Sequence, residues 1–422
     1  MANIFKEATF NFVGNINFGK EPLTIKNARK DGKGTFFKKK LGVGIKHKTF
    51  CPFLSMEVLQ EGVNPEKIKV LSKDNKLVEI PYAMTTNEDV MNRVADFTKV
   101  IVDLETDFEK KKEYMALIFK VRNHEFKLDN LLKKKEEEGL TTEEETEITE
   151  HQAKIAEYNA EISEKATNRH VFIMKDAIDF VNANLPEMKK HKIKVTGNAN
   201  CNYYNDNNKL QFVPKTIEYV EDSTPTQLKV EAVMFFGAKA VIDNSKDKKF
   251  MISGYLPQTR KQKTTLYPTM FVVDYSKLDL EQESQKKSLD FFKTVFDISD
   301  KKSIYRMLID IDIVDGAEVK EFTEADLTPI QKQAIALGFS TFEDYKPKNQ
   351  TYGANITEYR VVKPLLKDEF AGGADVSFAT QNLADYLPSD EEPVKETSTL
   401  TEIPKEEPKA NPLDAFDGLF GA

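Results

Sequence analysis

Two aspartates within an apolar run are the strongest candidates for catalytic chemistry in this chain. The segment RMLIDIDIVDG places Asp310 and Asp312 two residues apart, so both lie on one face of a predicted strand. Paired carboxylates at this spacing can hold Mg²⁺ for phosphoryl transfer. The alternating residues Ile309, Ile311 and Ile313 predict a core on the opposite face, which favours a solvated face for the aspartates. A Mg²⁺-dependent nuclease or nucleotidyl transferase is therefore kept as an alternative function.

The histidines and cysteines do not have the spacing of a metal site. The chain has five histidines and two cysteines, and none of these histidines stands at metal-ligand spacing from a second histidine or a cysteine. His124 and His151 fall on predicted helical seams, where they are expected to be polar seam residues. The GKGT at Gly32–Thr35 lacks the spacing and the hydroxyl residue of a phosphate loop. No metal and no cofactor is therefore predicted, and so few cysteines indicate a reducing compartment.

Charge is distributed unevenly along the chain. The formal net charge is −8, but residues 385–422 hold ten acids against three lysines, so the rest is close to neutral. Between Lys20 and Lys48 there are ten Lys or Arg residues and only two acids. The overall acidity therefore conceals a strongly basic segment and a separate acidic tail.

Hydrophobic periodicity predicts two β-rich regions, residues 1–105 and residues 169–370. The segment ATFNFVGNINFG alternates with a period of two, as a half-buried strand does. In the second region, the strands KIKVTGNANCNYY and KLQFVPKTIEYV are joined by NDNN, a hairpin turn signal. Helices are expected near residues 281–296 and 324–338. No run of 18 apolar residues occurs, so no membrane-spanning segment is predicted.

Residues 106–168 change to a heptad period and predict an antiparallel helical hairpin. Apolar residues recur at heptad spacing on both sides of KKKEEEGLTTEEE. Within that segment Gly139 suits a helix end, and Thr141 with Glu144, or Thr142 with Glu145, forms a capping-box pattern. A narrow seam with charged flanks indicates an arm that projects from the body. The composition of residues 371–422, rich in Pro, Glu, Ser, Thr and Lys, predicts a disordered tail.

Basic and aromatic residues occur together in both β-rich regions, in the combination that binds single-stranded nucleic acid. Lys and Arg follow phosphates, while aromatic rings stack on bases without regard to sequence. Adjacent rings such as Phe36 and Phe37 point to opposite faces of a strand, so only one of each pair can stack. The predicted contacts are Lys26, Arg29, Lys30, Lys33, Phe36, Phe37, Lys38, Lys39, Lys40, Lys46, His47, Lys48, Tyr203, Tyr204, Phe235, Lys239, Arg260, Lys261 and Lys263.

A basic, aromatic β body followed by an acidic tail with the apolar tip NPLDAFDGLFGA resembles the single-stranded DNA-binding proteins of bacterial and phage replication. The resemblance is one of layout and includes no alignable motif. It implies an oligonucleotide-binding (OB) body and a tail tip that docks on replication, recombination and repair enzymes. Family tips usually end with Phe beside consecutive aspartates, whereas here Gly421 and Ala422 follow Phe420. The predicted docking residues are Leu413, Asp414, Phe416, Asp417, Leu419 and Phe420.

The sequence therefore predicts an α+β, mainly β protein with two OB-like units, or one elaborated unit, and an inserted helical hairpin. We expect a non-enzymatic protein of the cytoplasm, or of the host cytoplasm if phage-encoded. It would coat single-stranded DNA and recruit replication or recombination proteins through its tail. The helical hairpin is a candidate for self-association. A structural or scaffold protein whose aromatic residues all belong to the core is the second alternative.

Overall fold

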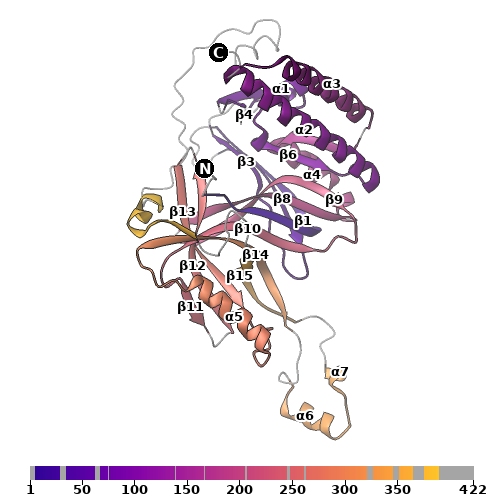
Figure 1. Ribbon diagram of the computed structural model, residues 1–422. Helices are drawn as coiled ribbons and strands as arrows, with labels where there is room; N and C mark the ends of the chain where they lie inside the picture. Colours follow the sequence, from indigo (N-terminus) through magenta and orange to yellow (C-terminus); the bar gives the residue numbers. More distant parts are fainter. Residues whose placement is uncertain are drawn as a thin grey trace.

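One large mixed sheet dominates the protein, and helices pack on it or project from it (Figure 1). The prediction of a sheet-dominated α+β protein is confirmed, whereas the finer assignment to OB-like units remains a prediction. The computed structural model describes residues 5–28, 35–61, 67–74, 76–137, 139–165, 167–204, 207–244, 248–260, 263–320, 327–345, 351–364 and 375–388.

The large sheet contains 14 strands in the described part of the chain. Its order is β11-β12-β13-β15-β14-β10-β1-β8-β9-β6-β7, with β2 on β1, β3 on β2 and β16 on β14. The strands are β1 (Thr9–Ala28), β2 (Thr35–Lys46), β3 (Met56–Glu61), β6 (Lys99–Asp103), β7 (Arg169–Ile173), β8 (Lys192–Tyr204), β9 (Asn207–Val220), β10 (Gln227–Phe236), β11 (Val241–Asn244), β12 (Lys249–Arg260), β13 (Lys263–Asp274), β14 (Ser303–Lys320), β15 (Thr351–Pro364) and β16 (Asp375–Ala379).

Within this sheet, strand pairings form a closed path in the N-terminal half, which we call the first ring. β1 pairs antiparallel with β2 and with β8, and β8 pairs antiparallel with β9. The segment that leads into β3 closes the path. There, Phe53 bridges Gly44 of β2, and Leu54 bridges Phe212 of β9 in the parallel sense.

A second closed path, which we call the second ring, has the same strand order. β10 pairs with β14, β14 with β15, and β12 with β13, all antiparallel. The path closes where Val272 of β13 pairs in parallel with Arg360 of β15 and where Phe235 of β10 pairs with Tyr255 of β12. In both rings the third strand in chain order is therefore parallel to the fifth. β1 and β10, the first strands of the two rings, pair with each other.

A helix precedes the fourth strand of each ring and packs on the main core. α4 (Met174–Met188) precedes β8, and α5 (Glu283–Phe296) precedes β14. α4 buries Ile178, Val181 and Leu185, whose spacing of three and four residues forms one apolar face. α5 buries Leu289 and Phe296 in the same core. The helix expected near residues 281–296 is thus confirmed.

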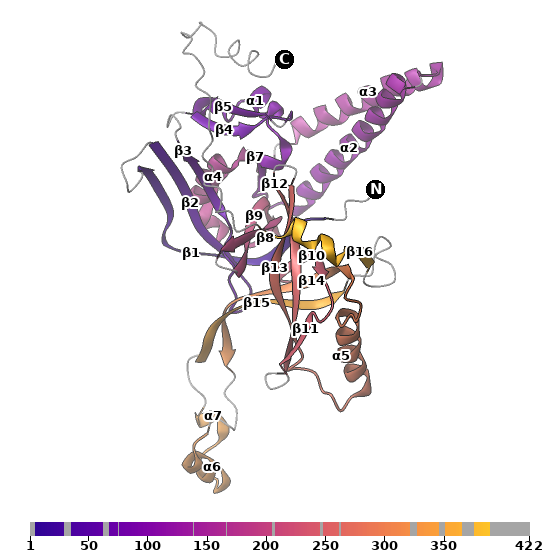
Figure 2. The same cartoon turned by 90° about the vertical axis from the view of Figure 1, so that its left-hand side faces the viewer.

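The helices α2 (Phe108–Glu137) and α3 (Thr142–Glu164) pair as an arm that projects from the body, as Figure 2 shows. Of the two predicted capping boxes, the one of Thr141 with Glu144 is present, since the Glu144 N–H donates to the Thr141 hydroxyl and the Glu144 carboxylate accepts from the Thr141 N–H. Gly139 has a φ of 83°, in the left-handed region that favours glycine. His124 and His151 face each other across the seam, with 3.1 Å between their Nδ1 atoms.

Two smaller parts complete the described structure. A two-stranded sheet of β4 (Lys67–Leu71) and β5 (Leu77–Pro81) packs with α1 (Glu88–Arg93) into a separate apolar cluster, and the 3₁₀ turns η1 (Tyr82–Met84) and η2 (Asp96–Thr98) flank α1. Between β14 and β15, α6 (Pro329–Ala336) and α7 (Phe342–Tyr345) lie far from the arm (Figures 1 and 2). The short segment η6 (Thr380–Tyr386) follows β16.

The strand pairings cross the domain boundaries that we expected from composition. β8 and β9 belong to the predicted second unit, 169–370, yet they pair in the first ring with β1. Within residues 371–422, predicted to be a disordered tail, residues 375–386 instead form β16 and η6. The division into residues 1–105, 106–168, 169–370 and 371–422 stays a prediction. Among the described residues, no helix combines the length and the apolar character needed to cross a membrane.

Candidate nucleic-acid interface

Four of the predicted lysines form an exposed row on the hairpin of β1 and β2. Lys26 lies directly opposite Lys38 in the strand register, and Lys40 lies two residues further along β2. Alternate residues of a strand point to one face, so Lys38, Lys40 and Lys46 share a face. Lys26, Lys40 and Lys46 are exposed. Like charges directly opposite each other destabilise a sheet, so this row favours an anionic ligand.

Lys38 is only partly committed to a protein partner. Its Nζ lies 3.4 Å from a carboxylate oxygen of Glu57 on β3, and both side chains are about one-third exposed. An exposed pair of this kind contributes little to stability, about 0–1 kcal/mol. Lys38 can therefore exchange Glu57 for a phosphate at small cost.

Lys39 does not belong to this row, and its prediction as a contact is wrong. Its side chain is only 6% exposed, on the opposite face of β2, where Leu41 and Val43 enter the core. The ammonium group pairs with the carboxylate of Asp179 on α4. Lys39 therefore ties a helix to the sheet and is not free for a phosphate.

The predicted residues His47 and Lys48 lie in the turn after β2. Backbone hydrogen bonds between His47 and Phe50 close this turn, and Lys48 has a φ of 56°. Partial burial lowers the pKa of His47, and the positive charge of Lys48 lowers it further. His47 is therefore neutral near pH 7, whereas the exposed Lys48 provides a positive charge beside the lysine row.

A second patch forms where the β8–β9 hairpin of the first ring packs on the β12–β13 hairpin of the second. The Cys201 N–H donates to the Gln258 side chain at 2.9 Å, and the Arg260 guanidinium donates to the Cys201 carbonyl at 3.3 Å. Tyr203 and Tyr267 lie beside each other, with ring centroids 5.9 Å apart. The structure thus brings together the predicted residues Tyr203 and Arg260, which are far apart in sequence.

Two features of this junction patch bear on nucleic acid. Arg260 and Lys263 are both exposed and directly opposite in the β12–β13 register, the same unfavourable arrangement as in the lysine row. Tyr203 and Tyr267 are half-buried, so their rings keep accessible surface. Sequence reasoning missed Tyr267 because no local signal marks it. Only the packing of β13 near β8 places it beside Tyr203.

Phe235 is not available to nucleic acid, and its prediction as a contact is wrong. Its side chain is 0% exposed. The ring packs between Phe5, at a centroid distance of 5.4 Å, and Phe378 of β16, at 6.1 Å. The C-terminal segment that contains β16 and η6 thus covers the outer face of the second ring, where Tyr386 also packs on Phe5.

The remaining predicted contacts divide between one exposed lysine and residues that are not fully described. Lys239 is exposed in the turn after β10, with a φ of 60°. Arg29, Lys30, Lys33 and Lys261 lie outside the described residues, as do the docking residues Leu413, Asp414, Phe416, Asp417, Leu419 and Phe420. Phe36, Phe37 and Tyr204 lie in described strands, but the surroundings of their side chains are not described.

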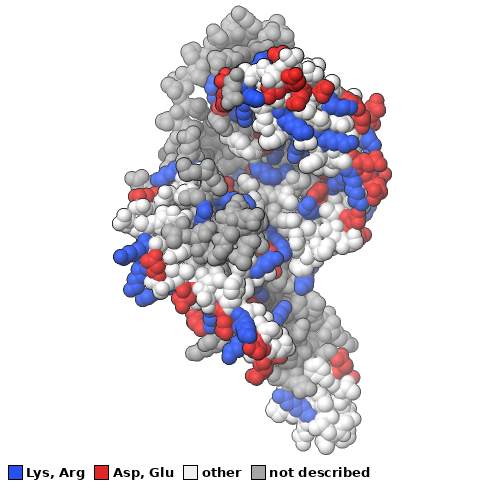
Figure 3. All heavy atoms as spheres, viewed as in Figure 1, with Lys and Arg blue, Asp and Glu red and all other residues white. Residues whose placement is uncertain are grey.

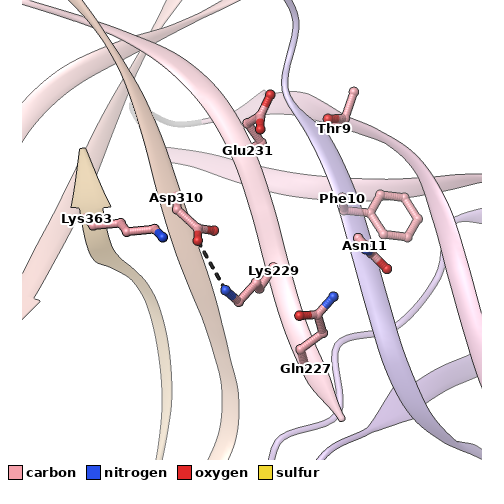
Figure 4. Close-up of a pocket in the computed structure, with 8 residues that line it drawn as sticks. All are labelled: Thr9, Phe10, Asn11, Gln227, Lys229, Glu231, Asp310 and Lys363. Atoms are coloured by element: carbon pink, nitrogen blue, oxygen red, sulfur yellow. Dashed lines mark hydrogen bonds and ion pairs between the residues drawn. The ribbon is translucent and has the colours of Figure 1, made fainter. Parts of the chain in front are cut away.

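Of the two aspartates of the alternative enzymatic function, Asp310 lines a polar hollow formed by β1, β10, β14 and β15 (Figure 4). The buried side chains of Ile309, Ile311 and Ile313 confirm the predicted core face. Asp310 is only 9% exposed, so the prediction that it is solvated is wrong. Its carboxylate accepts from Lys229 at 3.1 Å.

The surroundings of these aspartates favour charge pairing over metal chemistry. Asp312 reaches solvent, but the surrounding protein raises its pKa by desolvation, against the lowering effect of Lys229. In Figure 4 the Lys363 ammonium also points toward Asp310. Within the described ranges, no three His, Cys, Asp or Glu side chains come together as a possible metal site.

The comparisons with known proteins give no family for this chain. No protein-family model, no curated protein and no solved structure matches it.

Proposed function

We propose that this protein binds single-stranded DNA without sequence specificity and has no enzymatic activity. The observation that carries the proposal is the placement of two like-charge pairs, Lys26 opposite the partly exposed Lys38 and Arg260 opposite Lys263. A sheet that holds cations directly opposite each other is stabilised by an anion bound between them. The backbone of a nucleic acid supplies such anions at regular intervals.

The strand order of the two rings supports an OB-like assignment for each. In an OB fold the first strand pairs with the second and the fourth, and the third runs parallel to the fifth. Both rings have these pairings and a helix before the fourth strand. OB folds bind oligonucleotides on the face of strands two and three and in the loops after strands one and four.

The two patches coincide with these ligand-binding parts of an OB fold. The lysine row flanks the loop after strand one of the first ring, and Tyr203 precedes the loop after strand four. Arg260 is the last residue of strand two and Lys263 the first residue of strand three of the second ring. The lysine row would follow phosphates, while the tyrosines of the junction patch would stack on bases.

The acidic tail provides the second half of the proposed function. Its tip residues Leu413, Phe416, Leu419 and Phe420 have helical spacing, which suits docking into a groove of a replication or recombination enzyme. In this proposal the protein works in the cytoplasm, on DNA exposed during replication of a phage or mobile element. The layout of basic body and acidic tail supports this part.

A titration with labelled single-stranded and double-stranded oligonucleotides over a range of salt concentrations tests the proposal. We expect preference for single strands. Replacing Lys26, Lys38 and Lys40 with Ala removes three phosphate contacts, so the slope of log affinity on log salt should become shallower by about 2 units. The matched control replaces Lys277, Lys286 and Lys302, which are exposed away from both patches, and should keep the parental slope.

Two results would overturn the proposal. Absence of binding to any oligonucleotide at low salt would favour a structural or scaffold protein. Mg²⁺-dependent cleavage of the labelled strand that is lost in Asp310→Asn would instead favour the nuclease alternative.

A further inference from the structure

The arm has an apolar stripe on the side that faces away from its seam. Met115, Phe119 and Phe126 are exposed, with the two phenylalanine side chains 73% and 66% accessible. Their spacings of four and seven residues place them on one face of α2. The buried seam residues Leu117 and Val121 lie on the opposite face. The stripe therefore contributes nothing to the pairing of α2 with α3.

Charged residues border this stripe. Arg122, Lys133 and the acidic Asp129 are exposed on the same side of α2. In the turn η2, the pKa of the Asp96 carboxyl is lowered mainly by its hydrogen bond from Lys99 and, more weakly, by nearby charges that include Arg122. The next residue of that turn, Phe97, is also exposed. Figure 3 shows that basic and acidic side chains are otherwise interspersed over the arm.

Contiguous exposed aromatic residues on a monomer usually mark a binding site. The stripe offers apolar anchors for a helix–helix contact, with phenylalanines one heptad apart and charged residues beside them. A suitable occupant is a short segment with apolar residues at helical spacing and negative charges between them. One segment of this chain has this composition, namely residues 411–422, which contain Leu413, Phe416 and Phe420 with Asp414 and Asp417.

We propose that the apolar stripe of α2 binds the C-terminal tip, residues 411–422, of this same protein. Charge is complementary, because residues 385–422 hold ten acids and three lysines while Arg122 and Lys133 flank the stripe. The chain that precedes the tip is long as well. The described chain ends at Pro388, and the residues from there to the tip can extend by about 75 Å at roughly 3.3 Å each. The 30 residues of α2 span only about 45 Å.

This inference rests on the docking role of the tail in the proposed function but not on DNA binding. A tip bound to the arm is unavailable to enzymes until an enzyme with a higher affinity for the tip displaces it. Docking between neighbouring copies would also link them on a coated strand, which gives the arm a role in self-association. Whether the tip binds the arm of its own chain or that of a neighbouring copy, the same tip residues contact the same stripe.

A DNA-free peptide-binding experiment tests this contact. The probe is a fluorescein-labelled peptide of residues 411–422. The receptor is the full-length chain with Phe416→Ala and Phe420→Ala, so that its own tip does not compete. We expect a saturable rise in fluorescence anisotropy. Adding Phe119→Ala and Phe126→Ala should weaken binding tenfold or more, since each buried aromatic anchor contributes above about 1 kcal/mol.

Two further variants distinguish binding at the stripe from nonspecific hydrophobic binding. Arg122→Glu should weaken peptide binding severalfold and reduce its salt dependence. The matched control replaces Ile330 and Phe339, which are equally exposed on the distant α6 region, and should leave binding unchanged. Equal peptide affinity in the Phe119→Ala, Phe126→Ala receptor, or no saturable binding at all, would overturn the proposal. The oligonucleotide titration separately decides whether the protein binds DNA.

Discussion

The two rings have the same strand order but differ in what covers their outer faces. In the first ring, the β1–β2 hairpin leaves Lys26, Lys40 and Lys46 open to solvent. In the second ring, Phe5 and the segment with β16 and η6 cover the corresponding side of β10, and Phe235 becomes core. Equal topology therefore does not produce equal surfaces. Terminal segments of the chain that pack on a ring determine which of its strands remain exposed to a ligand.

The largest expected effect concerns the covered ring. Phe235→Ala would leave a cavity among Phe5, Leu266 and Phe378 and should destabilise the protein by about 3–5 kcal/mol. Urea unfolding followed by circular dichroism measures this loss. The DNA affinity of the protein that remains folded should be unchanged. A large loss of affinity with normal stability would mean that Phe235 contacts DNA after all.

The next effect concerns the open junction between the rings. Replacing Tyr203 or Tyr267 with Ala should weaken single-strand binding by about 1–3 kcal/mol for each ring that stacks on a base. The salt dependence should stay as in the parent, because no phosphate contact is lost. Fluorescence anisotropy at several salt concentrations measures both quantities. A changed salt slope with unchanged affinity at low salt would contradict stacking.

Substitutions of the adjacent residues Lys39 and Lys40 of β2 should have different effects because the two side chains lie on opposite faces of the strand. Lys39→Met breaks a charge-assisted hydrogen bond to Asp179 and should destabilise the protein by about 1–3 kcal/mol, with little effect on the salt slope. Lys40→Met should leave stability unchanged and make the slope shallower by about 0.7 units. Each variant is the control for the other. Identical behaviour would show that the two faces of β2 are not distinct.

The smallest effect is a pH dependence of the arm. Desolvation and the nearby charges of His151, Lys127 and Lys154 lower the pKa of His124 below 6.5. A folded-state pKa below the unfolded one means that the unfolded chain binds protons more readily. The stability of the arm should therefore be constant above about pH 6.5 and fall as the pH decreases below it.

Thermal unfolding of α2 and α3, followed by circular dichroism at pH 5 and pH 7.5, measures this dependence. His124→Asn keeps a polar seam residue without a titrating ring, so it should reduce the difference between the two pH values. An arm that is more stable at pH 5 would contradict the sign of the prediction.

Local sequence patterns determined the elements of this protein. The period-two segments became strands, the heptad segment became α2 and α3, and the Thr141–Glu144 pattern became a capping box. The cluster of lysines between Lys26 and Lys48 was also visible from the sequence. These features depend on residues that are near one another in the chain, so periodicity and turn chemistry are sufficient to predict them.

Tertiary structure decided which of these residues share a surface. Pairing β8 with β1 and packing β13 near β8 placed Tyr203 beside Tyr267, and no local pattern encodes that proximity. The same holds for the burial of Phe235 and for Lys39, whose partner Asp179 lies on a distant helix. A strand's composition indicates that one face must be buried, but the other face remains open until a remote segment covers it. The sequence by itself therefore determined the kinds of residue available for binding, and only long-range packing decided which of them remain exposed.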